Sequence, residues 1–162
     1  MLIHFLSSIS PILIPPLCGF AWVLTNNFFW MYTAISTFIF GEYLNLLIKK
    51  WVAHYFSHLT FVLRPNPDAY CGFLFKPITQ GTIAYGLPSG HCQTIGVFSA
   101  LVICYLLRTQ PKWWRTKIIV LIFASLYVGW SRWDLQCHTL LQISSGLAIG
   151  YCLGIIAWKI KM

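Results

Sequence analysis

Acidic residues are the scarcest feature of this chain. Only three of its 162 residues, Glu42, Asp68 and Asp134, are Asp or Glu, whereas eleven are Lys or Arg, so the formal net charge is +8. A hydrolytic mechanism that needs two carboxylates therefore has only these three candidate side chains. The basic residues lie at the ends of apolar segments and do not gather on one polar face. This placement excludes nucleic acid as a partner and indicates topology determinants and phosphate ligands instead.

Charged residues of both signs are also few. They make up 9% of the chain, against about 25% in typical soluble proteins, and hydrophobic residues make up 58%. A soluble domain of this length could not bury so much apolar surface, so the composition indicates an integral, multi-pass membrane protein. The length predicts a single domain over residues 1–162.

The six cysteines contain no CxxC pair, which argues against a zinc site or a thioredoxin-like site. Most of them lie in or beside apolar runs and are interpreted as small core residues. Cys71 and Cys137 fall in two loops that are expected to share one side of the membrane. A disulfide between these two residues stays an open alternative.

Five apolar runs predict an all-α membrane bundle with about five, and between four and six, transmembrane helices. They lie at about residues 2–24, 28–48, 92–107, 118–131 and 138–158. The first run lacks the basic segment and the small-residue cleavage site of a signal peptide, so we expect it to be retained as a span. Residues 51–63 form a weaker apolar stretch, either a helix at the membrane interface or an extension of the second span.

Basic residues predict the orientation of these spans. Six of them lie in the 108–117 loop or near the C-terminus: Arg108, Lys112, Arg115, Lys117, Lys159 and Lys161. With five spans, both segments lie on one side of the membrane, which the positive-inside rule makes cytoplasmic. The 49–91 loop and the 132–137 turn then share the lumenal or periplasmic side. Basic residues at 49, 50, 64 and 76 run against the rule there, which is explained if some of them bind an anionic substrate.

Three polar blocks stand at span ends on that second side. They are Arg-Pro at 64–65, Pro-Ser-Gly-His at 88–91, and Ser-Arg at 131–132 followed by five residues and His138. Histidine and arginine are normally avoided at such positions unless they serve a function. Together the blocks supply a nucleophile, a proton donor and a cationic clamp, which are the groups that phosphoester cleavage requires.

These blocks resemble the three motifs of the type 2 phosphatidic acid phosphatase (PAP2) superfamily. The family motifs are Lys-x6-Arg-Pro, Pro-Ser-Gly-His and Ser-Arg-x5-His-x3-Asp, and the resemblance covers about residues 41–155. The family lysine would fall on Ser57, so we infer an insertion of about eight residues before Arg64, which makes Lys49 the candidate lysine. Gln142 stands where the family has its aspartate.

Two details resemble the dolichyl diphosphate phosphatase branch of that superfamily. The sequence His-Thr-Leu-Leu-Gln at 138–142 matches the His-Thr-x-x-Gln form of this branch, and residues 85–93 are similar to its Tyr-Gly-Met-Pro-Ser-Ser-His-Ser-Gln. The resemblance implies hydrolysis of a polyprenyl diphosphate to the monophosphate without a metal or a cofactor. It also implies a role in lipid metabolism for N-glycosylation and, in a eukaryote, a place in the endoplasmic reticulum membrane.

The residue chemistry gives each candidate a role. His138 is expected to attack phosphorus and form a phosphohistidine, while His91 protonates the leaving oxygen and then activates water. Gln142, one turn after His138, is expected to accept a hydrogen bond from the imidazole and hold its tautomer. The phosphate oxygens are expected to contact guanidinium, ammonium, hydroxyl and backbone amide groups. These groups belong to Arg132, Arg64, Lys49, Ser89 and Gly90.

Alternatives remain at this stage. The chain could be a broad lipid phosphate phosphatase, or a catalytically silent membrane protein that binds a lipid headgroup. His4, His54 and His58 are interpreted as polar residues of the membrane interface. Asp134 is interpreted as a loop carboxylate, with compensation for the absent family aspartate as the other possibility. Membrane lipids and a lipid phosphate substrate are the expected partners, and the oligomeric state is left open.

Overall fold

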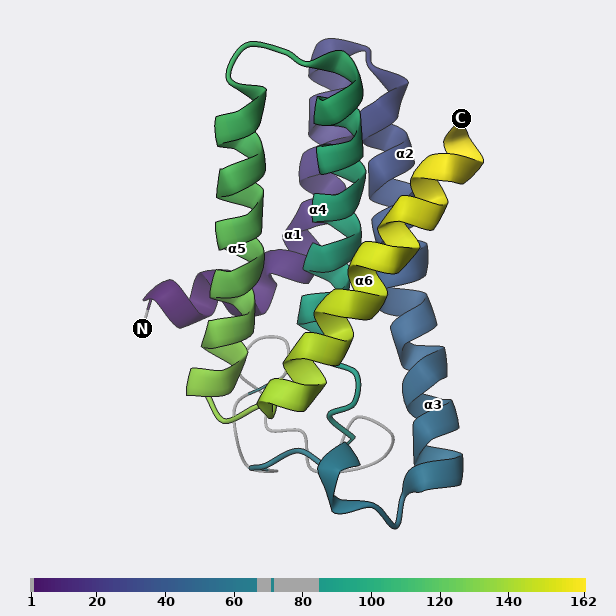
Figure 1. Ribbon diagram of the computed structural model, residues 1–162, viewed down its shortest axis with the longest axis vertical. Coiled ribbons are helices and arrows are strands. Elements are labelled where there is room, and N and C mark those ends of the chain that lie inside the picture. The colour runs from purple at the N-terminus through teal and green to yellow at the C-terminus, as the bar shows by residue number, and fades with distance from the viewer. Residues whose placement is uncertain (1, 67–70, 72–84) are drawn as a thin grey trace.

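The structure is a computed structural model that describes residues 2–66, 71 and 85–162, with side chains from residue 12 onward (Figure 1). Asp68 and Lys76 lie outside the described residues. The elements in chain order are α1 (Leu2–Thr25), α2 (Phe28–Ser36), the π-helical η1 (Thr37–Tyr43), α3 (Leu44–Phe56), the short 3₁₀ helix η2 (Thr60–Val62), α4 (Gly90–Thr109), α5 (Trp114–Asp134) and α6 (Leu140–Lys161).

The prediction of an all-α membrane bundle is confirmed. Among the described residues, three helical segments are long and apolar enough to cross a membrane: Phe28–Phe56, Gly90–Thr109 and Leu140–Lys161. Ile12–Thr25 is a shorter apolar helix, and α5 runs alongside α4 over a similar length. The strand-like pairing within the described part of the chain is a single antiparallel bridge between Leu63 and Tyr85.

The second span is longer than its apolar run at 28–48 suggested. Helices α2, η1 and α3 follow one another without a break, so residues up to Phe56 extend this span and do not form a separate interfacial helix. The extension ends in a turn in which the Leu59 amide donates to the Phe56 carbonyl over 3.0 Å. A π-helical segment within an α-helix is uncommon and is often found at functional sites.

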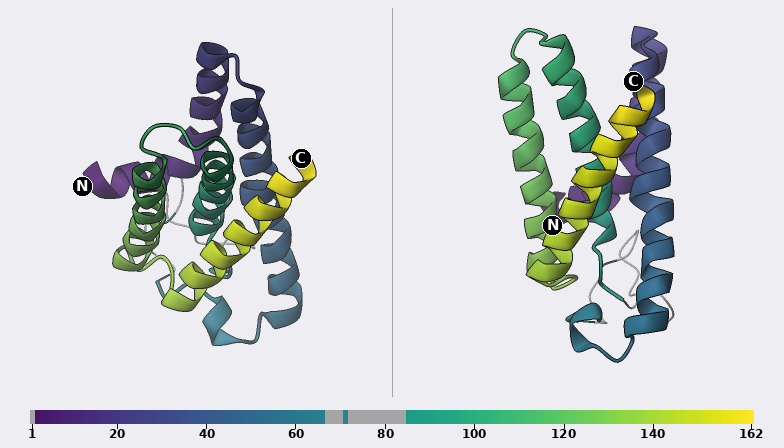
Figure 2. Two further views of the ribbon diagram at one scale, coloured as in Figure 1. Left: turned by 45° about the horizontal axis from the view of Figure 1, so that its top comes forward. Right: turned by 45° about the vertical axis from the view of Figure 1, so that its right-hand side comes forward.

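Helix α1 changes direction along its length, so its first part lies across the bundle and its second part lies along it (Figures 1 and 2). Three prolines, at positions 11, 15 and 16, fall within the helix. Proline lacks the N–H that the helical ladder needs and clashes with the preceding turn, which explains the bend.

Helix α4 is the centre of the bundle, and α6 crosses it obliquely (Figure 2). Glycines on α6 allow the two backbones to approach closely. A Cβ on Gly146 would stand 2.6 Å from the Ser89 carbonyl oxygen, and one on Gly154 would stand 2.7 Å from the Val97 carbonyl oxygen. This close packing brings the start of α6 against the 88–90 turn.

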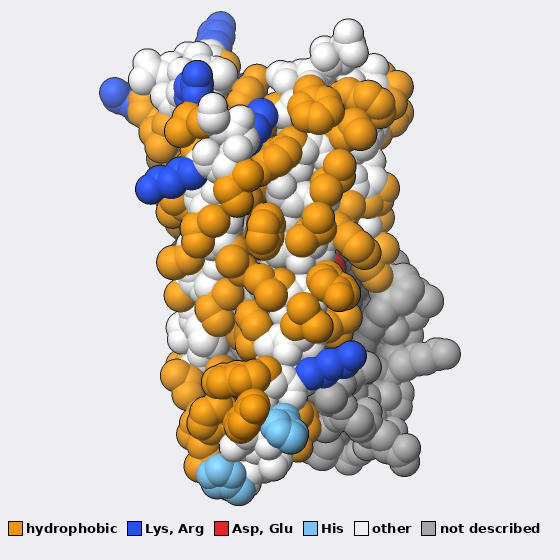
Figure 3. Space-filling model, turned by 90° about the vertical axis from the view of Figure 1, so that its right-hand side faces the viewer, with side chains coloured by type: hydrophobic (Ala, Val, Ile, Leu, Met, Phe, Trp, Pro, Cys, Tyr) orange, Lys and Arg blue, Asp and Glu red, His pale blue; other side chains and the backbone are white. Residues whose placement is uncertain are grey.

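The predicted grouping of loops is also confirmed. The α4–α5 loop and the C-terminus lie at one end of the bundle, where Arg108 Nη1 donates to Met162 Sδ over 2.9 Å (Figure 1). The α5–α6 turn and residues 57–66 lie at the other end. Figure 3 shows Lys and Arg side chains gathered at the first end of one face, and His side chains toward the second. We call these the basic end and the site end.

Candidate active site

The turn before α4 presents two of the predicted phosphate ligands. Ser89 is the N-cap of α4 and is fully buried, but its side chain makes no capping hydrogen bond to the helix. Gly90 is the first helical residue, so its amide is among the N–H groups that have no partner within the helix. The Ser89 amide donates to the Gln142 carbonyl over 3.0 Å, which ties this turn to α6. A helix start of this kind suits an anion.

A buried amide network holds the turn against the second span. Asn45 Nδ2 donates to Gln93 Oε1 over 2.8 Å and lies 3.4 Å from the Pro88 carbonyl oxygen. Gln93 Nε2 donates to the Phe40 carbonyl over 2.7 Å. Sequence reasoning did not assign Asn45 and Gln93 to the site, although amides inside apolar runs were a usable signal.

The imidazole of His138 is buried and contacts a partner at each nitrogen. Its Nδ1 lies 3.1 Å from Gln142 Oε1, and its Nε2 lies 3.1 Å from Arg64 Nη1. The side-chain nitrogen Nε2 of Gln142 donates to the backbone carbonyls of Phe61 and Leu63, so the side-chain oxygen Oε1 must face the imidazole. A guanidinium only donates, so Nδ1 carries the proton and Nε2 presents its lone pair.

Gln142 is fixed from several directions. Its side-chain oxygen accepts from the Thr139 amide over 3.3 Å, and the Thr139 hydroxyl accepts from the Gln142 amide over 3.3 Å, which forms a capping box at the start of α6. A Cβ added to Gly86 would collide with the Gln142 side-chain amide. The orienting contact predicted between Gln142 and His138 is therefore present and tightly packed.

Of the two predicted guanidinium ligands, Arg64 contacts the nucleophile candidate, and Arg132 interacts electrostatically with Arg64. Arg64 also donates to the Cys137 carbonyl over 3.1 Å. Arg132 is fully buried and donates to Ser131 Oγ over 3.1 Å, while its own carbonyl accepts from the Cys137 and His138 amides. Burial, followed by the positive charge of Arg132, lowers the pKa of Arg64 to about 10, so Arg64 is still charged at neutral pH.

Lys49 reaches the same region from α3. Its side chain is 6% exposed and interacts electrostatically with Arg64, with Glu42 and with His138. After α3 the chain turns at 57–59 and leads to Arg64, whose Nη1 lies 3.1 Å from His138 Nε2.

Positive charge surrounds the His138 imidazole. Burial lowers its pKa well below 6.5, and the charges of Arg64, Lys49 and His91 lower it further, while the Gln142 contact opposes them. His91 thus lies within electrostatic reach of His138, as predicted for a pair that acts on one group. A site with this charge and a neutral imidazole is suited to an anion.

Glu42 lies next to the candidate site, and sequence reasoning did not assign it. It belongs to η1, where Thr94 Oγ1 donates to its Oε1 over 2.5 Å and where it interacts electrostatically with Lys49. Asp134, the other described carboxylate, ends α5 at the site end. A carboxylate inside an apolar run was the signal that pointed to Glu42.

A disulfide joins Cys71 to Cys137, with a Cα–Cα separation of 5.4 Å. The disulfide that the sequence left as an open alternative is therefore present. Cys137 directly precedes His138, so the bond secures the α5–α6 turn next to the imidazole. The other four cysteines are free.

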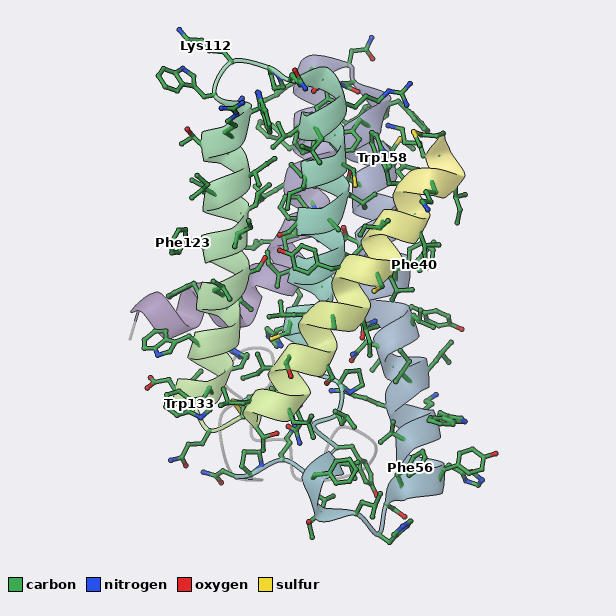
Figure 4. The ribbon with its side chains drawn as sticks, viewed as in Figure 1. Phe40, Phe56, Lys112, Phe123, Trp133 and Trp158 are labelled. Atoms are coloured by element: carbon green, nitrogen blue, oxygen red, sulfur yellow. A yellow bond between two sulfur atoms is a disulfide. The ribbon has the colours of Figure 1, made fainter. Side chains whose placement is uncertain are left out.

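The α5–α6 turn follows Trp133. This residue lies at the same end of the bundle as Phe56, and Lys112 and Trp158 lie toward the opposite end (Figure 4).

These features define the class of protein: a polytopic helical membrane protein with a buried cluster of His, Arg and Lys side chains at one end. The chain belongs to the PAP2 superfamily, whose family description matches residues 30–162. It is also similar to "Dolichyldiphosphatase 1" of Dictyostelium discoideum, with 34% identity over 108 residues. The aligned region is 62% of this chain and 46% of that relative, so the chain spans about half the length of the curated relative it matches. No solved structure matches the chain.

Proposed function

We propose that this protein is a metal-independent membrane phosphatase that hydrolyses a polyprenyl diphosphate of the dolichyl type to the monophosphate through a phosphohistidine. One observation carries the proposal: His138 is held as the Nδ1–H tautomer with its Nε2 lone pair directed at the Arg64 guanidinium. An imidazole in this state is a nucleophile aimed at the position where a guanidinium-bound phosphate would lie.

The reaction proceeds in two displacements. His138 Nε2 attacks the terminal phosphorus, and the bond between that phosphorus and the bridging oxygen breaks. His91 donates a proton to the bridging oxygen, and the polyprenyl monophosphate leaves. His91 then accepts a proton from water, whose oxygen attacks the phosphohistidine. Inorganic phosphate is released and His138 returns to its starting form.

Arg64 changes partners during this cycle. In the structure it lies against Nε2, and in the proposed cycle the arriving phosphate binds the guanidinium and uncovers the lone pair. Arg132, Lys49, the Ser89 hydroxyl and the Gly90 amide bind the remaining oxygens, where charge develops in the transition state.

Glu42 acts on this clamp through Lys49. The carboxylate is held by Thr94 and interacts with the Lys49 ammonium, which otherwise faces Arg64 and His138. Glu42 is thus a positioning residue for Lys49, because its carboxylate supplies the opposite charge among the groups with which the ammonium interacts.

The substrate class and the location follow from separate observations. The His-Thr-x-x-Gln form at 138–142 and the similarity to a protein named dolichyldiphosphatase favour a polyprenyl diphosphate. The Cys71–Cys137 disulfide at the site end fits an oxidising compartment, and the cationic α4–α5 loop fits the cytoplasmic face. We therefore place the active site on the lumenal or periplasmic side, in the endoplasmic reticulum if the source is eukaryotic.

The test is an assay of the purified protein in detergent with EDTA present. Dolichyl diphosphate, undecaprenyl diphosphate and phosphatidic acid are offered separately, and released phosphate is measured. The proposal expects release from the polyprenyl diphosphates at least about 10-fold faster than from phosphatidic acid, which corresponds to about 1.4 kcal/mol. Equal rates would indicate a broad lipid phosphatase. No release from any of the three would favour a catalytically silent headgroup binder.

A further inference from the structure

The basic end contains an apolar cavity that the proposed chemistry does not use. It has a volume of about 670 Å³ and lies between α4 and α5, with one wall from α2. Its lining residues are Trp30, Phe98, Val102, Tyr105, Leu106, Thr109, Pro111, Trp113, Thr116, Lys117, Val120 and Leu121. Trp30 and Phe98 also line a smaller apolar cavity of about 250 Å³ beside α1, so the two cavities adjoin.

The depth of the larger cavity matches one leaflet of a bilayer. Phe98 and Thr109 line it from positions eleven residues apart on α4, which corresponds to about 16 Å along the helix. The hydrocarbon core of a bilayer is about 30 Å thick, so half of it is about 15 Å. A cavity of this length accommodates one acyl chain that enters from the membrane surface.

The mouth of the cavity is cationic. Lys117 is exposed and lines it, and the Lys112 ammonium lies 5.8 Å from the centre of the Trp113 ring, which also lines it. The carboxylate side chains of the described residues, Glu42 and Asp134, belong to η1 and to the opposite end of α5. The mouth therefore complements a negatively charged headgroup, while the interior complements its chain.

We infer that this cavity is a binding site for one anionic phospholipid of the leaflet at the basic end, separate from the candidate active site. Its acyl chain lies along α4 between Val102 and Val120, and its phosphate contacts Lys112 and Lys117. A charge-neutral headgroup would gain the same apolar contacts but not the attraction to the two ammonium groups. In the orientation proposed above, this is the cytoplasmic leaflet, which is the leaflet enriched in anionic lipids.

The test is native mass spectrometry of the delipidated full-length protein, titrated with phosphatidylglycerol or with phosphatidylcholine of identical acyl chains. Phosphatidylglycerol is expected to bind with 1:1 stoichiometry and about 30-fold more tightly, since each basic residue near a membrane surface contributes about fivefold. Lys112→Gln/Lys117→Gln should remove this preference and leave phosphatidylcholine binding unchanged. Val120→Trp, which fills the cavity, should weaken both lipids.

The matched control is Lys159→Gln/Lys161→Gln, which removes the same charge from the same end without touching the cavity lining. It should keep the preference for phosphatidylglycerol. Equal binding of the two lipids to the unmodified protein would overturn the inference, because affinity would then depend only on apolar contacts. An equal loss of preference in the control would also overturn it, because affinity would then depend only on the total charge of this end. Inorganic phosphate added in excess should not compete, and effective competition would mean that the site binds phosphate alone. These outcomes do not depend on phosphatase activity.

Discussion

The two ends of the bundle use the same kinds of residue in opposite surroundings. At the site end Lys49, Arg132 and His138 are buried, and each touches or interacts with another charged or polar group. At the basic end the side chains of Lys112, Arg115 and Lys117 are exposed, and two of them lie over indole rings. Burying a cation is costly, and under the proposed function a bound phosphate offsets that cost at the site end, whereas the exposed cations of the basic end stay solvated at the membrane surface.

Removal of the buried His138 imidazole is expected to have the largest effect, and it tests the contrast between the site end and the basic end. His138→Ala should lower phosphate release by on the order of 10⁴-fold or more, because a nucleophile that works as part of a unit cannot be replaced by its neighbours. The matched control is His54→Ala, an exposed histidine near the same end of the bundle. Near-normal release by His138→Ala would mean that another group attacks phosphorus.

The orienting amide should matter somewhat less. Gln142→Ala leaves the imidazole without its Nδ1 partner and should lower turnover by about 10²–10⁴-fold while the helices stay folded by circular dichroism. Gly86→Ala should produce a similar loss, because its methyl group would displace the same amide. Gly19→Ala, whose added carbon meets nothing within 4 Å, is the control and should keep full turnover. A fully active Gly86→Ala would show that the packing around Gln142 is not needed.

Lys49 and Lys50 sharpen the comparison within one helix. Lys49 is buried and faces the site, whereas Lys50 is exposed. Lys49→Ala should lower turnover by about 10²-fold, the usual loss for one preorganised transition-state contact. Lys50→Ala and Arg115→Gln should each change it by less than about twofold. Equal losses for Lys49→Ala and Lys50→Ala would show that Lys49 is only a boundary residue.

The smallest predicted effect is a shift in pH dependence. Burial and the surrounding cations hold the pKa of His138 well below 6.5, so the imidazole is neutral and reactive at pH 7. The contribution of His138 to kcat/KM is lost only as the pH falls through that lowered pKa. In Gln142→Asp a carboxylate stabilises the imidazolium, raises the pKa and moves the acidic limb upward by about one pH unit. An unchanged or lowered limb in the kcat/KM profile would contradict this role of Gln142.

The sequence predicted the helices and the end of the bundle at which the candidate site residues lie, because both depend on local information. Apolar runs of about twenty residues identify spans, and the three polar blocks place Arg64, His91 and His138 at span ends. The continuity of Phe28–Phe56 could not be read from composition, since Lys49 and Lys50 interrupt the apolar run although the helix continues. The Glu42–Thr94 contact depends on how distant segments pack. The same holds for the lack of space for a Cβ at position 86, next to the Gln142 side chain. No periodicity encodes such contacts.

Direct trapping of the intermediate tests the central claim, that His138 is the nucleophile, most directly. The protein is mixed with dolichyl diphosphate labelled at the terminal phosphate, quenched in alkali during turnover and digested, and the labelled peptide is identified by mass spectrometry. We predict an acid-labile, alkali-stable phosphate on His138 that is absent from His138→Ala. Turnover without such a phosphate, or with a phosphate on any other residue, would contradict the account.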